Sequence, residues 1–372
     1  MSSKGALPCQ MIKRMMEAGF ILDAKEENVS PASLDLTVSK EIYRVEGIML
    51  PSPQLEDKGY GIRGMLDRIG AERHTGCLAV GETYIARLNE HFKLPDTVYG
   101  YANPKSSTGR NDVHVRTLAD SVPRFDALTP AGIETEVWAV IIPKSYPVRI
   151  YEGLALSQMR FFNSDTRFHE TELEIEMGLQ PLVYTPEGLP MSYRDLKVSD
   201  KDGSIILSLD LQSSPIGFRT YGMKKVMDLA APKGSVNPRH FFEPIVPRED
   251  GMLLLRKGEF YILSTLEYVC VPPHLSCEMV SMDERNGEFR SHYAGFIDPG
   301  WGCGHDGLLK GRPLTLELRP YEDLFVYNGH PIAKIRFERM VEIPETVYDQ
   351  KGTSNYSGQD RAWLSKQFAA WR

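Results

Sequence analysis

The sequence lacks the signatures of several well-known nucleotide and zinc enzymes. It contains no GxxxxGK[ST] run, which disfavours a phosphate site of the P-loop type. It also contains no HxE motif followed by PCxxC, which disfavours the hydrolytic deaminases that depend on zinc. The five cysteines are scattered, odd in number and never spaced as CxxC. We therefore expect reduced thiols rather than a disulfide framework or a zinc site.

Two further absences restrict the location and the partners of the protein. No apolar run approaches the roughly 18 residues that span a bilayer. The N-terminal stretch MSSKGALPCQMIKRMM has no uninterrupted hydrophobic segment of the signal-peptide kind. We therefore expect a cytoplasmic protein with no membrane partner. The formal net charge of −7 argues against nucleic acid as the main partner, whereas a local basic cluster can still bind a small anion.

The chain of 372 residues contains an internal repeat. Three blocks recur at offsets of 175, 177 and 176 residues: SLDL at 33 and 208, GETY and GEFY at 81 and 258, and YEGLALSQMRFF and YNGHPIAKIRFE at 151 and 327. Such constant offsets indicate a duplication. We place the join in the polar stretch 190–204, which divides the chain into domains at residues 1–195 and 196–372.

Most segments have strand character, because they are short, rich in β-branched and aromatic residues, and bounded by Gly, Pro, Asn or Asp. The clearest are residues 83–94, 135–143, 314–318, 325–329 and 333–343. Helices are expected only locally, at 10–19 and, with weaker patterns, at 65–72 and in the tail 360–372. The predicted fold class is all-β with minor helices, in two tandem barrel-like domains.

One hexapeptide in the first half, KSSTGR at residues 105–110, has the composition of a phosphate cradle. Ser106 and Ser107 can donate hydroxyl hydrogen bonds to phosphate oxygens. Lys105 and Arg110 supply positive charge, and an arginine can supply it in a bidentate contact. Taken alone, the hexapeptide is also typical of an ordinary polar loop with two exposed cations.

In the second half, two carboxylates stand at informative positions. Asp298 lies in a tight Asp-Pro-Gly-Trp turn, and Glu317 interrupts the apolar strand LTLEL. In a strand of period 2, Glu317 points to the same side as Thr315, away from the leucines. That side can be the solvent face, or it can be a pocket wall. Burial in a pocket would raise the pKa of Glu317 and suit it to proton transfer.

These motifs in this order resemble the dCTP deaminases of the dUTPase superfamily, in a tandem-repeat form. The first half resembles the family over GETYIARLNEHFKLPDTVYGYANPKSSTGRNDVHV. The second half resembles it through YAGFIDPGWG, LTLELRP and IRFE, and then through VYDQKGTSNYSGQ. The resemblance implies two dUTPase-like distorted β-barrel or jelly-roll domains, and it covers most of both halves.

The resemblance also implies an activity, which is the hydrolysis of dCTP to dUTP and ammonia without zinc, in the supply of dUTP and dTTP precursors. By likeness to the family, Glu317 would be the general acid and base. Ser106 and the carbonyl of Ala294 would position the attacking water.

The remaining assignments concern binding and follow from the same resemblance. Mg²⁺ would be bound through the triphosphate of the substrate. The triphosphate would be held by Lys105, Ser107 and Arg110. The sugar and the base would be recognised by Asp298, Thr315 and Leu316. The tail residues that would close over the nucleotide are Tyr348, Tyr356 and Gln359.

The two halves are not equivalent. Where the family places its catalytic glutamate, the first half has Val140 or Ile141, depending on a gap of one residue. Where the family places its two serines, the second half has Asp283 and Glu284, which would repel a triphosphate. Each half has therefore lost what the other retains, which predicts one composite site with a cradle from the first half and a glutamate from the second.

Several features depart from the family pattern or leave alternatives open. The first cradle position is Lys, Phe296 stands where many relatives carry a cation, Asn355 stands where the tail usually carries Lys, and residues 303–312 are an insertion. A dUTP pyrophosphatase, alone or coupled to deamination, is one alternative, with Asp298 activating water. A non-catalytic deoxynucleotide-binding module is another. We expect a homo-oligomer, and dTTP is a candidate feedback inhibitor.

Overall fold

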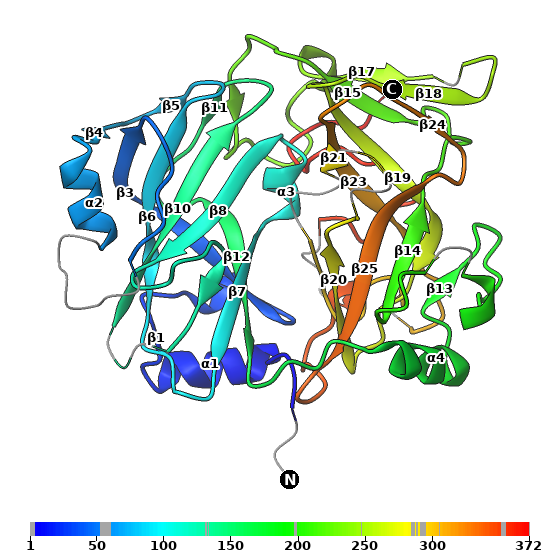
Figure 1. Cartoon of the computed structure of the whole chain (residues 1–372), viewed down its shortest axis with the longest axis horizontal. Coiled ribbons are helices and arrows are strands. Elements are labelled where there is room, and N and C mark those ends of the chain that lie inside the picture. The colour runs from blue at the N-terminus through cyan, green and yellow to red at the C-terminus, as the bar shows by residue number, and fades with distance from the viewer. Residues whose placement is uncertain are drawn as a thin grey trace.

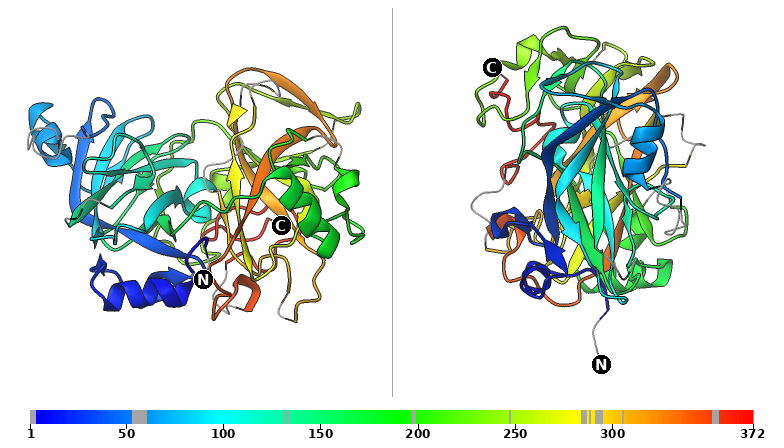
Figure 2. Two further views of the ribbon diagram at one scale, coloured as in Figure 1. Left: turned by 60° about the horizontal axis from the view of Figure 1, so that its bottom comes forward. Right: turned by 90° about the vertical axis from the view of Figure 1, so that its left-hand side faces the viewer.

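The computed structural model describes residues 4–52, 61–130, 132, 134–196, 199–246, 248–283, 287, 289–290, 295–304, 306–350 and 355–371. Two β-rich bodies lie side by side, one built from each half of the chain (Figure 1). They stay side by side in the left-hand view of Figure 2. The prediction of an all-β fold with minor helices, in two tandem barrel-like domains, is confirmed.

The first half contains most of the described helix. Its elements are α1 (Cys9–Glu17), β1 (Ile21–Leu22), η1 (Glu26–Asn28), β2 (Val29–Ser30), β3 (Ser33–Val45), α2 (Ile62–Arg68), β4 (Glu72–Arg73), β5 (Cys77–Leu78), β6 (Thr83–Phe92), β7 (Tyr99–Pro104), α3 (Ser106–Gly109), β8 (Val113–Ala119), β9 (Ala127–Leu128), β10 (Thr135–Pro143), β11 (Val148–Arg149), β12 (Ala155–Phe162), α4 (Glu170–Leu179), β13 (Val183–Tyr184) and η2 (Tyr193–Asp195).

The second half is almost entirely strand. Its elements are β14 (Ser204–Ser208), β15 (Gly217–Thr220), β16 (Met227–Asp228), η3 (Pro238–His240), β17 (Glu243–Ile245), β18 (Met252–Leu255), β19 (Phe260–Val269), β20 (Leu275–Val280), β21 (Phe289–Arg290), β22 (Phe296–Ile297), β23 (Arg312–Pro320), β24 (Leu324–Tyr327), β25 (Pro331–Arg339) and η5 (Tyr348–Gln350).

The sheets follow one plan in both halves. In the first half a sheet runs in the order β8-β10-β6-β3-β12-β7-β9. The second half repeats its central pairings as β23 beside β19 and as β14-β25-β20. Even the turn glycines match, since Gly81 and Gly258 have φ of 79° and 80°, and Gly153 and Gly329 have φ of 79° and 85°. These left-handed values favour glycine at both copies of each turn.

Strand β10 shows why a central strand of the sheet has a nearly continuous apolar sequence. Trp138, Val140 and Ile142 pack in a small cluster on one face of the sheet. Val137, Ala139 and Ile141 face the main core of the first half. A strand that is buried on both faces has no solvent side on which polar residues can alternate.

The cores do not separate cleanly at the middle of the chain. Residues 168–183 pack in the second core. A segment of the second half crosses to the first core, where Met227, Leu229, Phe241 and Phe242 are buried. Met227 also pairs with Val148 in a parallel ladder. The two halves therefore share apolar contacts, and the domain division between residues 195 and 196 stays a prediction.

The helix expectations had mixed outcomes. The helix expected at 10–19 is α1, which buries Ile12 and Met15, and the weaker pattern at 65–72 overlaps α2. The tail helix expected at 360–372 is wrong. Phe368 in the tail instead forms a parallel bridge with Val236, and the amide of Val236 donates to the carbonyl of Gln367 at 2.9 Å. Backbone groups of the tail therefore form hydrogen bonds with another segment and not with a helical turn. None of the described helices is long and apolar enough to cross a membrane.

Candidate active site

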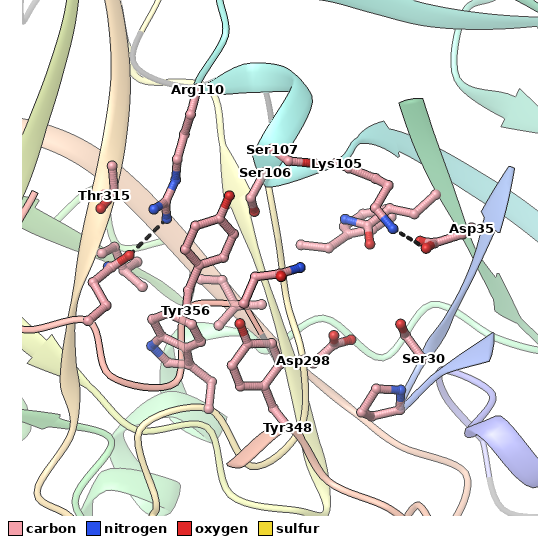
Figure 3. Close-up of a pocket in the computed structure, with 18 of the residues that line it drawn as sticks. Ser30, Asp35, Lys105, Ser106, Ser107, Arg110, Asp298, Thr315, Tyr348 and Tyr356 are labelled. Carbon is pink, nitrogen blue, oxygen red and sulfur yellow. Dashed lines mark hydrogen bonds and ion pairs between the residues drawn. The ribbon is translucent and has the colours of Figure 1, made fainter. Parts of the chain in front are cut away.

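A pocket opens between the two halves and draws its walls from both of them. It contains ≈ 1270 Å³ of empty space, part of which is continuous with solvent. Figure 3 shows cradle residues from the first half facing Asp298, Thr315 and two tail tyrosines from the second. The pocket forms within one chain, whereas the sequence alone left open whether its two parts meet within one chain or between chains.

The cradle is a single helical turn at the end of strand β7. Lys105 ends the extended backbone with φ −67° and ψ 148°, and α3 then carries Ser106 and Ser107 into the pocket. The amides of Thr108 and Gly109 donate to the carbonyl of Lys105 at 2.8 and 3.0 Å, which closes the turn. The Lys105 ammonium is ion-paired with Asp35, a residue of the repeated SLDL block.

Strand β23 presents its polar side to the pocket. Glu317 and Thr315 both line the pocket, whereas Leu316 and Leu318 are buried in the second core. Glu317 is only 2% exposed. The period-2 argument therefore holds for Leu316 and Leu318, although Leu314 at the start of the segment also lines the pocket. For Glu317 the pocket wall, and not the solvent face, is the correct alternative. Because the Leu316 side chain is in the core, only its backbone can take part in the site.

Arg110 joins the two halves at the centre of the pocket. Arg110 is 4% exposed, and its Nε lies 3.8 Å from Oε1 of Glu317. Its Nη2 donates to Oε1 of Gln359 at 2.9 Å, and its Nη1 donates to the carbonyl of Trp363 at 3.0 Å. The Tyr356 ring lies below it, with 3.9 Å between Cζ and the ring centroid. A first-half cation is thus held by second-half groups next to the candidate catalytic carboxylate.

The Asp298 turn forms another wall of the pocket. The amide of Trp301 donates to the carbonyl of Asp298 at 3.1 Å and closes the turn. Gly300 has φ of 86°, and a Cβ at this position would lie 2.5 Å from Cβ of Val347. Only glycine allows this close approach. The approach lets the amide of Tyr348 donate to the carbonyl of Pro299 at 2.8 Å, so the tail begins on this turn.

The tail folds over the pocket and continues onto the cradle. The Tyr348 ring lies 5.0 Å from the Trp301 ring, between centroids. Nε2 of Gln359 donates to the carbonyl of Pro313 at 2.7 Å, while its oxygen accepts from Arg110. Farther on, Oγ of Ser365 donates to the carbonyl of Ser107 at 2.8 Å. The C-terminal segment of the second half therefore fastens the cradle of the first.

Most of the predicted site residues lie together. The structure places ten of them on the pocket wall: Lys105, Ser106, Ser107, Arg110, Asp298, Thr315, Glu317, Tyr348, Tyr356 and Gln359. Ala294 lies outside the described residues. The roles given to these residues stay predictions.

Sequence reasoning missed part of the wall. Asp35, Gln158 and Trp301 line the pocket, together with Glu27 and Ser30. Two signals could have found some of them, because Asp35 belongs to the repeated SLDL block, and Gln158 belongs to the repeated block that begins at Tyr151.

Strand register resolves which first-half residue corresponds to Glu317. Glu317 lies opposite Ile262, and Val140 lies opposite Ile85. Since Ile85 and Ile262 are 177 residues apart, as the GETY and GEFY blocks are, Val140 is the counterpart of Glu317. Val140 is buried in an apolar cluster and cannot move a proton. The first half alone therefore has no equivalent of the candidate catalytic group.

The chemistry of the wall bears on metal binding. Among the described residues, no group of three or more His, Cys, Asp or Glu side chains is placed to hold a metal ion. The cradle offers hydroxyls and cations, and the carboxylates of Asp35 and Glu27 also line the pocket. Such a wall fits a metal ion that arrives on an anionic ligand better than one held in a protein cage.

Fold and site together define the class: a duplicated β-barrel protein with a pocket between its two repeats, lined by cations, hydroxyls and a buried carboxylate. The N-terminal domain family of 2′-deoxycytidine 5′-triphosphate deaminase (DCD) matches residues 3–165, and the C-terminal domain family of the same enzyme matches residues 188–368. A solved structure of 2′-deoxycytidine 5′-triphosphate deaminase from Agrobacterium tumefaciens is 32% identical, with a TM-score of 0.81, and the match covers 92% of this chain and 97% of that one. The chain belongs to the dCTP deaminase family, in a tandem form.

Curated relatives match over shorter stretches. A dCTP deaminase, dUMP-forming, from Dictyoglomus turgidum is 32% identical over 134 residues, which are 35% of this chain and 64% of the relative. A protein of the same name from Corynebacterium jeikeium is 29% identical over 185 residues, which are 47% of this chain and 89% of the relative. The first of these matches spans less than two thirds of the relative's length.

Proposed function

We propose that this chain hydrolyses dCTP to dUTP and ammonia at the pocket between its two halves. The observation that carries the proposal is the meeting of Arg110 from the first half with Glu317 from the second, 3.8 Å apart in one pocket. A triphosphate would lie along the cradle, with Mg²⁺ on its oxygens, and would place the base near Glu317. The family membership supports the choice of substrate.

In the proposed reaction, water adds to C4 of the cytosine ring and the bond from C4 to the amino nitrogen breaks. Glu317 takes one proton from the water and delivers it to N3. It then takes the second proton from the new hydroxyl on C4 and passes it to the amine, which leaves as ammonia while the C4 carbonyl of dUTP forms. A positioned carboxylate that shuttles protons in this way typically contributes a factor of about 10²–10⁴ in rate. Ser106 and the carbonyl of Ala294 would orient the water, and the chemistry would need no zinc.

The other side chains would bind rather than react. Lys105, Ser107 and Arg110 would hold the triphosphate, and Asp298 would accept a hydrogen bond from a hydroxyl of the deoxyribose. The backbones of Thr315 and Leu316 would contact the base, while Tyr348, Tyr356 and Gln359 would close over the nucleotide. A cytoplasmic location, a homo-oligomeric state and feedback inhibition by dTTP remain predictions.

A second candidate is dUMP formation, in which pyrophosphate is also released. Two observations favour it: the curated relatives are named dUMP-forming, and Asp298 lies in the same pocket as Glu317. An aspartate placed near the α-phosphorus could activate a second water molecule there. The identity of the product separates the two candidates.

The test is incubation of the purified chain with dCTP, Mg²⁺ and a zinc chelator, with the nucleotides resolved by ion-exchange chromatography. We expect dUTP from the wild type and a loss of about 10²–10⁴-fold in rate for Glu317→Gln and for Ser106→Ala. Glu136→Gln is the matched control, because Glu136 lies on the corresponding first-half strand and pairs with Arg63 instead.

Each other outcome points to a different conclusion. Release of dUMP and pyrophosphate would establish the second candidate. Binding of dCTP without turnover of either dCTP or dUTP would reject the enzyme and leave a nucleotide-binding module. Full activity of Glu317→Gln would reject the assigned mechanism.

A further inference from the structure

Arg160 on strand β12 is a fully buried cation of the first half that reaches into the second half. Its exposed fraction is 0%, and it is not on the pocket wall. Its Nη1 donates to the carbonyl of Cys277 at 3.1 Å, and its Nη2 donates to the carbonyl of Ile297 at 2.9 Å. A buried guanidinium is costly unless its charge and donors are satisfied, so this position calls for an explanation.

The two carbonyls belong to residues that face each other across a strand pair. Cys277 of β20 and Ile297 of β22 are register partners. Strand β22 is two residues long and leads directly into Asp298. At the other end of β22, the amide of Gly295 donates to Oδ1 of Asn103 at 2.8 Å, a second contact from the first half. The rigid fork of Arg160 therefore clamps a short strand that carries pocket residues.

The charge of Arg160 is shared between two second-half carboxylates. Its Nη2 lies 3.7 Å from Oδ1 of Asp298, and its Nη1 lies 3.2 Å from Oε1 of Glu338. Its Cζ lies 4.4 Å from the centroid of the Phe296 ring. Phe296 and Asp298 both line the pocket. Arg160 thus contacts Phe296 and Asp298 from the side opposite to the pocket.

The duplication supplies a comparison at the corresponding position. Arg160 lies opposite Tyr101 in the first half, and Arg336 lies opposite Glu278 in the second. Arg336 also binds backbone carbonyls, those of Phe168 at 3.0 Å and of Asp202 at 2.8 Å. Those residues lie away from the pocket wall. The two arginines at this strand position therefore have different surroundings, and of the two it is Arg160 that contacts residues of the pocket wall.

We infer that Arg160 is a positioning residue of the composite site, which fixes Asp298 for recognition of the sugar hydroxyl of the nucleotide. This inference rests on the proposed function, in which Asp298 accepts that hydrogen bond. The first half then contributes twice to one site, through the cradle that holds the phosphates and through a buried arginine that sets the sugar wall of the other half.

The test measures selectivity between dCTP and 2′,3′-dideoxycytidine triphosphate, which lacks the 3′-hydroxyl. We expect Arg160→Lys to lower the ratio of kcat/KM for the two nucleotides by about tenfold, because a lysine keeps the charge but cannot hold both carbonyls and Asp298. The loss should fall on KM for dCTP and leave the dideoxy analogue almost unchanged. Arg336→Lys, the matched control, should keep the wild-type ratio.

Asp298→Asn completes a double-mutant cycle. If Arg160 acts through Asp298, adding Arg160→Lys to Asp298→Asn should not lower the ratio of kcat/KM below that of Asp298→Asn alone. If Arg160→Lys does not fold, the pair Arg160→Met and Glu338→Gln removes the buried cation and one of its carboxylates together. The inference would be overturned if a folded Arg160 variant keeps the wild-type ratio while Asp298→Asn abolishes the selectivity for dCTP over the dideoxy analogue. If wild-type protein neither binds nor converts dCTP, the proposed function itself fails, a result distinct from the loss of selectivity.

Discussion

The two halves of this chain share strand order, register and turn glycines, yet they differ at the positions where chemistry is needed. At one position the second half has Glu317 and the first half has the buried Val140. At another the first half has Arg110, whereas the residue 177 positions later is Gly287. The pocket contains the polar member of each pair, Glu317 and Arg110. The difference shows that a duplication can keep one complete site when each copy supplies a different part.

Beyond the losses expected for Glu317→Gln and Ser106→Ala, the largest effect on kcat/KM should come from changing the first-half cation, Arg110. Arg110→Lys keeps a positive charge but loses the fork that holds Gln359, the Trp363 carbonyl and the Tyr356 ring. We expect kcat/KM for dCTP to fall about 100-fold, the size of two lost hydrogen bonds to a charged group. Steady-state kinetics measure this.

The matched control for that change is Arg116→Lys. Arg116 lies in the same half, pairs with Asp126 at 2.8 Å and is not on the pocket wall. It should change kcat/KM by less than about twofold. Equal losses for the two variants would mean that Arg110 has no special relation to Glu317.

A smaller effect should appear in stability at a position where the halves also differ. The residue that corresponds to Glu338 in the first half is Phe162. Burial, opposed by the charge of Arg160 and reinforced by Glu278, raises the pKa of Glu338 to about 7 from 4.5. Between these values the folded chain holds a proton that the unfolded chain has released, so stability decreases as pH rises through this window.

We therefore expect wild-type protein to lose roughly 3 kcal/mol more than Glu338→Gln in the free energy of unfolding between pH 4.5 and pH 7. Urea unfolding at several pH values measures the difference. Glu345→Gln, at an exposed position, should follow the wild type. A parallel decline in wild type and Glu338→Gln would show that Glu338 does not release its proton in this range.

The sequence was sufficient to predict strand positions and the side on which Glu317 lies, where the hydrophobic pattern and the internal repeat could be read directly. Residues 135–143 form β10 with the predicted bounds, and the alternation in LTLEL correctly put Glu317 beside Thr315. Neither result needed knowledge of the fold, because a strand period and a repeat offset can both be read from the sequence itself. The repeat also limited the counterpart of Glu317 to Val140 or Ile141, and strand register then selected Val140.

The sequence was insufficient where distant segments decide the structure. The tail 360–372 has a helical pattern, but it pairs with residues near Val236 and fastens the cradle through Ser365. The helix α4 was not predicted, because its N-cap is His169 and not one of the usual Ser, Thr, Asp or Asn residues, and the contact of Glu172 with the amide of His169 exists only in the folded chain. Arg160 was not noticed, because its partners in the second half become neighbours only after folding.

The central claim is that the cradle and the glutamate of one and the same chain form the working site. The most direct measurement co-expresses Ser106→Ala and Glu317→Gln chains with different tags and assays the species that contain both for turnover of dCTP. We predict no recovery, because each chain retains one defective part of its own site. Recovery to about half of wild-type activity in dimers that contain one chain of each kind would mean that the two parts come from different chains, and would contradict the account.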